Sequence, residues 1–139
     1  MKITRKKEDF IIYINKYEID NKCLNKGLEN YIKDIILKLK RTRIKDMSGS
    51  YKTKVYYNKI YGFIINMFHD KDIEYFPDII DVNIKIYNDS ELYYKTKDIF
   101  LIKDKKYEEK NKEYIVNIKD LNEKELIKLI EHGEITNIV

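Results

Sequence analysis

The sequence has few of the residues that build covalent or metal-bound sites. It contains one cysteine, Cys23, and two histidines, His69 and His132, which lie far apart along the chain. A lone cysteine forms no internal disulfide, and this scattered set lacks zinc-ligand spacing. The four glycines are isolated from one another, which excludes a glycine-rich phosphate loop. We therefore expect neither a cofactor nor a bound metal ion.

Long hydrophobic runs are absent too. The chain starts with basic residues, followed by Glu8, Asp9 and a short apolar run from Phe10 to Ile14. This run is too short for the core of a signal peptide or for a membrane-spanning helix. We therefore expect a cytoplasmic protein with no membrane partner.

Alanine, glutamine and tryptophan are missing altogether, whereas isoleucine, lysine, tyrosine and asparagine are abundant. The abundant four have codons rich in A and T, and alanine has codons rich in G and C. Mutational bias in an AT-rich genome, such as that of a low-GC bacterium, its phage or its plasmid, produces this composition without functional selection. The positions of lysine and tyrosine, rather than their number, must therefore carry any argument for nucleic-acid binding.

The residues that are present suffice for a folded domain. The chain has 139 residues, of which 43% are hydrophobic and 37% are charged. A chain of this length buries roughly two-thirds of its unfolded surface, so it can form a core without disulfides. We expect residues 1–139 to form a single α+β domain with a densely charged surface.

Two stretches have helical periodicity. Apolar residues between Leu24 and Leu39 recur every three or four positions and predict an amphipathic helix of about five turns. A second, short helix is predicted over residues 121–130. Asp120 and Glu123 have the spacing of a capping box at its start, and Gly133 stands where a C-terminal cap belongs.

Apolar and alternating segments between the helices predict strands. Residues 60–68 are apolar on both faces and predict a central strand that is covered on both sides, with Gly62 marking a bulge or a close backbone approach. Residues 82–86 alternate and are followed by a turn, so we expect strand 92–96 to face them. The remaining strands are predicted at 10–14, 51–57 and 114–118.

The order of these elements predicts an α+β fold. We expect a five- to six-stranded, mainly antiparallel sheet. A long helix from the N-terminal half and a short C-terminal helix are expected to pack on one face of it.

Charge is segregated along the sequence. Residues 33–54 hold eight cations and two carboxylates, a net charge of +6, and residues 69–91 hold seven carboxylates and two cations, a net charge of −5. Such asymmetry can steer charged partners. If the two segments pair with each other inside the molecule, the charge asymmetry gives no information about a partner.

The basic segment is the candidate contact for an anionic partner. Arg41 and Arg43 are two of only three arginines, and the planar guanidinium suits phosphate or carboxylate. Tyrosines just downstream could stack on bases. Alternatively, these cations complement the dipole at a helix C-terminus and the tyrosines fill a core. The candidate residues are Lys38, Lys40, Arg41, Arg43, Lys45, Lys52 and Lys54.

The acidic segment is the candidate contact for a basic partner, through Asp70, Asp72, Glu74 and Asp78. The same carboxylates also fall in the frame of a calcium loop. However, Tyr75 occupies the position that requires glycine, and no helix pattern flanks the loop. A solvated acidic loop or a docking patch fits these residues better.

Two catalytic interpretations are weaker still. Pro77 and Asp78, followed by Asn83 and Lys85, resemble the Asp and acid-x-Lys pattern of metal-dependent nucleases related to restriction enzymes, but Asn83 replaces the second carboxylate. Cys23 near a helix start could have a lowered thiol pKa, although most lone cysteines are inert. No catalytic residue is therefore predicted.

The leading hypothesis is a small non-enzymatic binding or accessory module that acts through protein–protein interaction or self-association. The second is nucleic-acid binding through the basic segment 38–54. The third is an enzyme whose site assembles from dispersed residues. A protein-binding role predicts a contiguous, exposed patch of tyrosine and isoleucine.

Overall fold

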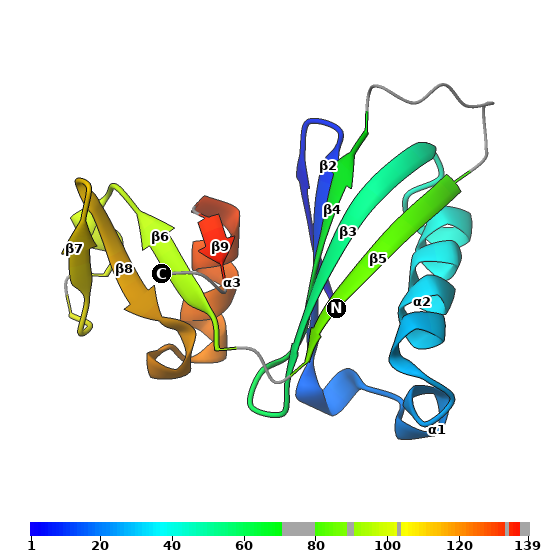
Figure 1. Ribbon diagram of the computed structural model, residues 1–139, viewed down its shortest axis with the longest axis horizontal. Coiled ribbons are helices and arrows are strands. Elements are labelled where there is room, and N and C mark those ends of the chain that lie inside the picture. Colours follow the sequence, from blue (N-terminus) through cyan, green and yellow to red (C-terminus); the bar gives the residue numbers. More distant parts are fainter. Residues whose placement is uncertain (71–79, 89–90, 103, 133, 137–139) are drawn as a thin grey trace.

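The computed structural model describes residues 1–70, 80–88, 91–102, 104–132 and 134–136. These residues form two sheets, which Figure 1 shows as separate lobes. The N-terminal lobe (residues 1–88) holds a five-stranded sheet with the strand order β1-β2-β4-β3-β5. The C-terminal lobe (residues 91–136) holds a four-stranded sheet with the order β7-β8-β6-β9.

The five-stranded sheet is antiparallel except at one edge. Its strands are β1 (Lys2–Lys6), β2 (Asp9–Asn15), β3 (Gly49–Asn58), β4 (Gly62–His69) and β5 (Ile80–Asn88). The central strand is β4, which pairs with β2 on one side and with β3 on the other. The edge strand β5 runs parallel to β3.

The predicted first helix is divided in two. Residues Asn21–Leu24 form α1, which Asp20 caps, and residues Leu28–Thr42 form α2. The chain turns between them at Gly27, whose φ of +121° is a conformation that residues with a Cβ rarely adopt. The apolar stripe continues across this break, which is why the sequence pattern predicts a single helix.

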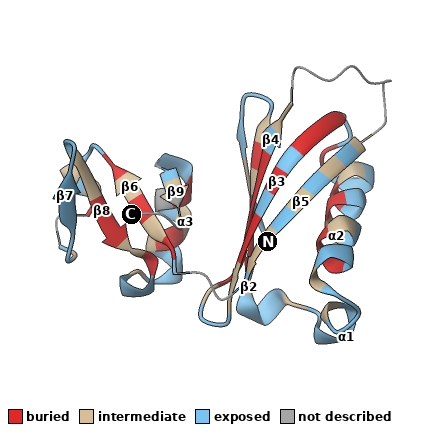
Figure 2. Cartoon of the chain, in the orientation of Figure 1, coloured by how far each residue is buried: buried red, intermediate tan, exposed pale blue. Residues whose placement is uncertain are grey.

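One face of the five-stranded sheet packs against α2. Alternate residues of β2, β3 and β4 point to this face and meet the buried stripe of the helix, which consists of Tyr31, Ile32, Ile36 and Leu39. Figure 2 shows this buried stripe on the side of α2 that faces the sheet. We call this cluster the helix-side core.

The opposite face of the same sheet packs against the C-terminal lobe. Residues on this face of β2, β3 and β4 meet Leu92, Ile118 and residues of α3 (Glu123–His132). We call this cluster the inter-lobe core, and it consists of Tyr13, Tyr56, Ile64, Leu92, Ile118, Leu126 and Ile130. Together with the helix-side core, it explains why residues 63–65 are apolar on both faces.

The C-terminal lobe is small and has a third, local cluster of Tyr94, Ile102 and Val116. Its strands are β6 (Tyr93–Thr96), β7 (Glu108–Lys110), β8 (Glu113–Asn117) and β9 (Glu134–Thr136), and its short 3-10 helices are η2 (Ile99–Leu101) and η3 (Ile118–Asp120). In Figure 1, α3 lies between the two sheets.

The α+β fold class, the mainly antiparallel five-stranded sheet, the long helix and the short C-terminal helix are confirmed. The details differ in three ways. Strand β5 pairs with β3 rather than with β6, the strands after residue 91 form their own sheet, and α2 and α3 lie on opposite faces of the larger sheet. Alternation along a strand fixes which side chains share a face, but it does not fix which strand lies alongside.

Candidate binding site between the two lobes

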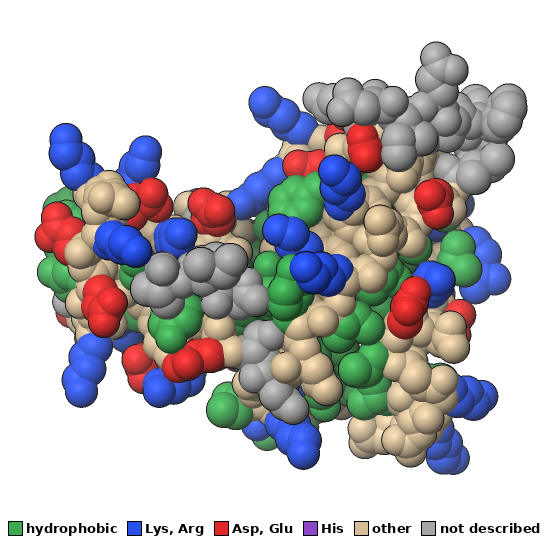
Figure 3. Space-filling view, viewed as in Figure 1, with side chains coloured by type: hydrophobic (Ala, Val, Ile, Leu, Met, Phe, Trp, Pro, Cys, Tyr) green, Lys and Arg blue, Asp and Glu red, His purple; other side chains and the backbone are tan. Residues whose placement is uncertain are grey.

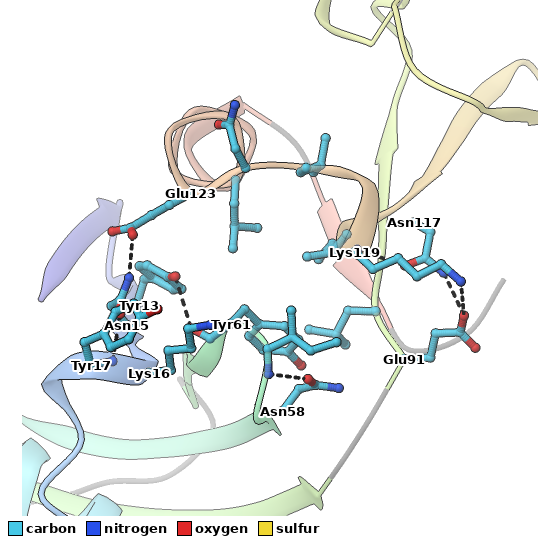
Figure 4. A pocket seen from close by; sticks show the side chains of 16 residues that line it. Tyr13, Asn15, Lys16, Tyr17, Asn58, Tyr61, Glu91, Asn117, Lys119 and Glu123 are labelled. Atoms are coloured by element: carbon cyan, nitrogen blue, oxygen red, sulfur yellow. Dashed lines mark hydrogen bonds and ion pairs between the residues drawn. The ribbon is translucent and has the colours of Figure 1, made fainter.

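A pocket of about 320 Å³ lies where the two lobes meet. One side comes from the end of β2, from η1 (Lys16–Glu18) and from the turn between β3 and β4. The other side comes from Glu91, Leu92, η3 and the start of α3. Figure 4 shows Tyr13, Asn15 and Tyr61 facing Glu123, with Glu91, Asn117 and Lys119 further along the opening.

The inner part of the pocket is apolar. Four of its lining residues, Tyr13, Leu92, Ile118 and Leu126, are buried members of the inter-lobe core. At the mouth, two apolar side chains are instead exposed: Tyr17 is 84% exposed and Ile60 is 64% exposed. The pocket therefore joins an apolar interior to an exposed apolar rim.

Asparagines shape the rim. Each accepts a hydrogen bond on its side-chain oxygen from a backbone N–H two or three residues later, as asparagine commonly does in turns and at helix starts. The acceptors are Asn15 (2.8 Å from Tyr17 N), Asn58 (2.7 Å from Ile60 N), Asn117 (3.0 Å from Lys119 N) and Asn122 (2.8 Å from Glu125 N). The backbone N–H groups of the two exposed residues, Tyr17 and Ile60, are thus each held by an asparagine side chain.

The cap of α3 differs from the sequence prediction. Asn122 and Glu125 exchange hydrogen bonds, because the Glu125 side chain accepts from the Asn122 backbone at 3.1 Å. Glu125 also forms an ion pair with Lys105 at 2.9 Å. Asp120 instead belongs to η3, and Glu123 is left to accept a hydrogen bond from the Asn15 side chain across the pocket.

The charges at the pocket are mixed. Glu91 accepts a hydrogen bond from the Asn117 side chain at 2.7 Å and lies 4.0 Å from the Lys119 ammonium. The Lys16 ammonium lies 4.9 Å from the centre of the Tyr17 ring. No single charge dominates the opening, so the pocket does not select strongly for an anion or a cation.

Tyr13 is the most perturbed titratable group of the site. Burial, with a smaller contribution from Glu123 and Glu18, raises the pKa of Tyr13 to about 12. Its neutral hydroxyl donates a hydrogen bond to the carbonyl oxygen of Tyr61 at 3.1 Å, which ties β2 to the turn before β4. Among the described lining residues there is no serine, threonine, cysteine or histidine.

The structure does not bring the predicted basic residues together. Lys38, Lys40 and Arg41 belong to α2, and Arg43 and Lys45 follow it. Lys52 and Lys54 point to the opposite face of the sheet, because they alternate with Tyr51, Thr53 and Val55, which face α2. Lys40 donates a hydrogen bond to the Lys45 carbonyl at 2.7 Å, so it helps to close the turn after the helix.

The predicted acidic patch is described only in part. Asp70 follows β4, and its backbone N–H donates to the Ser50 carbonyl at 2.8 Å. Asp72, Glu74 and Asp78 lie outside the described residues, and with them most of the calcium-loop frame and the first half of the nuclease pattern.

Cys23 and His69 have local structural partners. The exposed Cys23 thiol lies 3.5 Å from an Asp20 carboxylate oxygen, and this hydrogen bond raises the pKa of Cys23. A raised pKa is the reverse of what a nucleophilic thiol requires. His69 lies 3.4 Å from Glu8 and edge-on to Tyr51.

In the described part of the chain, no three or more histidine, cysteine, aspartate or glutamate side chains come together in a way that could hold a metal ion. In the same residues, none of the helices is both long enough and apolar enough to cross a membrane.

The pocket itself has little signature in the sequence. Its sides come from segments that are distant in the sequence, and the hydrogen bond between Asn15 and Glu123 joins residues 108 positions apart. The one available signal is the spacing of Asn15 and Glu18, which is that of a capping box and marks the η1 turn.

Comparison of the chain with protein-family models, with curated proteins and with solved structures gave no match.

Proposed function

We propose that this chain is a small non-enzymatic binding module that acts through protein–protein interaction, and that the pocket between the lobes receives an apolar side chain of its partner. The partner segment would place that side chain against Tyr13, Leu92 and Leu126. Its backbone would meet the asparagine-rich rim, which offers donors and acceptors.

The observation that supports this proposal is the exposure of Tyr17 and Ile60 at the mouth of the pocket. Two large apolar side chains held in water beside an apolar cavity are typical of interaction sites. Their turns are fixed by Asn15 and Asn58, so little conformational freedom would be lost on binding. Tyrosine is also enriched among the residues that dominate binding energy at interfaces.

The pocket chemistry gives less support to an enzyme. Its four asparagines cap turns, and the Tyr13 hydroxyl is held neutral by burial. The basic segment 38–54 gives less support to nucleic-acid binding in the structure than in the sequence. The reason is that Lys52 and Lys54 lie across the sheet from the cations of α2. We propose a cytoplasmic location, where a lone thiol such as Cys23 stays reduced.

The test is affinity capture from cells of the natural source with three forms of the chain. These are the unmodified chain, a double variant with Tyr17→Ser and Ile60→Ser, and the control Phe100→Ser. Phe100 is 79% exposed on η2 and does not line the pocket. The control therefore also removes a large exposed apolar side chain, but away from the pocket.

The proposal predicts one protein that is retained by the unmodified chain and by Phe100→Ser, is lost with the double variant and resists nuclease treatment. Equal capture by all three forms would contradict the pocket as the site. If the capture that depends on Tyr17 and Ile60 is abolished by nuclease, the partner of the pocket is a nucleic acid rather than a protein. If the captured partner is a second copy of the chain, sedimentation of the purified protein will show a dimer that the double variant lacks.

A further inference from the structure

The inter-lobe core covers only part of the sheet face that points away from α2. The other part, toward the end of β4 and the start of β3, carries side chains that belong to neither core. We call this surface the open face, and it consists of Lys52 and Lys54 on β3, Asn66 and Phe68 on β4, and Asn83 and Lys85 on β5. Figure 3 shows lysine and arginine side chains gathered over the sheet beside the hollow between the lobes.

The open face has cations without matching anions. Lys54 and Lys85 are direct partners in the register of β3 and β5, and Lys52 precedes Lys54 by two residues on the same face. All three are exposed, and within the described residues none of them forms an ion pair with a carboxylate. Like charges placed directly opposite each other destabilise a sheet, so an anion bound here would relieve this repulsion.

Aromatic rings lie next to these cations. Phe68 is 43% exposed, and the Lys54 ammonium lies 5.9 Å from the centre of its ring. The Lys85 ammonium lies 5.4 Å from the centre of the Tyr87 ring, which is itself stacked on Tyr56 at 5.0 Å. Lys54 and Lys85 thus each have an aromatic ring beside them.

One buried polar atom on this face has no partner. Asn66 is 7% exposed, lies in register with Lys54, and its side-chain oxygen makes no hydrogen bond in the structure. A buried acceptor without a donor is unfavourable, so a turn of the Asn66 amide that brings this oxygen to a ligand N–H would be stabilised. Two carboxylates lie toward the end of the face, namely Asp81 on β5 and Asp9 on β2, which accepts a hydrogen bond from the His69 backbone at 2.9 Å.

We propose that the open face binds single-stranded nucleic acid. The phosphates lie against Lys52, Lys54 and Lys85, a base stacks on Phe68, and a base edge reaches Asn66. An acidic protein or an anionic membrane surface would also meet the lysines, but it offers no planar base to stack on Phe68 and no base edge for Asn66. A duplex holds its bases stacked inside, whereas a single strand can place one on an aromatic ring. This site is separate from the pocket of the proposed function.

The test is fluorescence anisotropy of a labelled thymidine oligonucleotide with the full chain, and of a duplex of the same length. We expect binding to the single strand that weakens with salt. The slope of log K against log salt concentration should be about −2, because three phosphate contacts on a single strand contribute about 0.7 each.

The variant Lys54→Glu with Lys85→Glu should weaken binding at least tenfold. The matched control Lys38→Glu with Arg41→Glu makes the same change in net charge on α2 and should change the affinity less than twofold. Phe68→Ala removes an exposed ring without opening a core and should weaken binding about tenfold, in the range measured for stacked bases. Circular dichroism melting of each variant establishes that it is folded.

Four results would overturn the proposal. These are no anisotropy change at low salt, equal losses in the sheet variant and in the α2 control, equal affinity for duplex and single strand, and an unchanged affinity in Phe68→Ala. Binding of anionic phospholipid vesicles with no binding of the oligonucleotide would assign the open face to a membrane surface instead.

Discussion

Gly62 lies against the backbone of Ile14 so closely that a Cβ atom on Gly62 would stand 2.2 Å from the Ile14 carbonyl oxygen. The same atom would be 2.7 Å from the backbone nitrogen of Lys16. The φ of Gly62 is +108°, which is also unfavourable for other residues. The close approach that the sequence predicts at this glycine is thus confirmed, and it fixes where β2 ends and the pocket begins.

We expect Gly62→Ala to lower the free energy of unfolding by more than about 3 kcal/mol, the cost of backbone strain with a steric clash added. Gly27→Ala is the matched control. Gly27 has a φ of +121°, but its nearest contact to an added Cβ is the flexible Asn30 side chain at 3.8 Å. The free energy of unfolding of this control should fall by only about 1–3 kcal/mol. Urea unfolding followed by circular dichroism measures both, and equal losses would contradict a role for the close approach.

The inter-lobe core should contribute strongly to stability. Leu126 is 3% exposed and packs between the lobes, so Leu126→Ala should cost about 2–5 kcal/mol. The same substitution at Leu37, which is 47% exposed on α2, should change the unfolding free energy by about 0.5 kcal/mol or less. A small effect at Leu126 would mean that the lobes are held together by something else.

Tyr13 should make the fold sensitive to alkaline pH. Its pKa is about 12 in the folded chain against the ordinary value of 10.0, so the fold favours the neutral phenol. This contribution to stability is fully present below pH 10 and is lost as the pH rises from about 10 to about 12. Tyr13→Phe cannot ionise, so its unfolding free energy should fall less steeply across this window.

Unfolding free energies measured at a series of pH values test this difference. Burial also raises the pKa of Tyr56, so some alkaline loss will remain in the variant. Parallel declines in the two proteins would show that Tyr13 ionises equally in the folded and unfolded chains.

Cys23 should react slowly with thiol reagents at neutral pH. Its hydrogen bond to Asp20 raises the pKa of the thiol, and Asp20→Asn removes the carboxylate while keeping a good helix cap. We expect the pH midpoint of alkylation by iodoacetamide to shift downward in this variant. An unchanged midpoint would show that Asp20 does not control the thiol.

The sequence predicts those features that depend on a local pattern. The run at residues 60–68 indicates a strand buried on both faces, and β4 has this position. The alternation at 82–86 indicates a strand, but β5 pairs with β3 rather than with the strand that follows it in sequence. The apolar stripe does not reveal the break at Gly27, because the spacing of hydrophobic residues carries no information about a single positive φ.

The candidate site is harder to predict because it is assembled from segments distant in sequence. Asn15 and Glu123 meet across the pocket only because the C-terminal lobe packs on the second face of the sheet. In the same way, Lys52 and Lys54 are close in sequence to Arg41 and Arg43, but strand alternation sends them to the other side of the sheet. Net charge over a sequence window cannot show that separation.

The two-sided role of β2 has a consequence for synthesis on the ribosome. Ile12 belongs to the helix-side core, and Tyr13 belongs to the inter-lobe core. The larger sheet supplies only Tyr13, Tyr56 and Ile64 to the inter-lobe core, and all its other members lie at residue 92 or beyond. The five-stranded sheet can therefore form before the last third of the chain has emerged, but one of its faces would then be bare and apolar. During that interval the nascent chain should be a target for chaperones, and a truncated product that lacks α3 should be prone to aggregate.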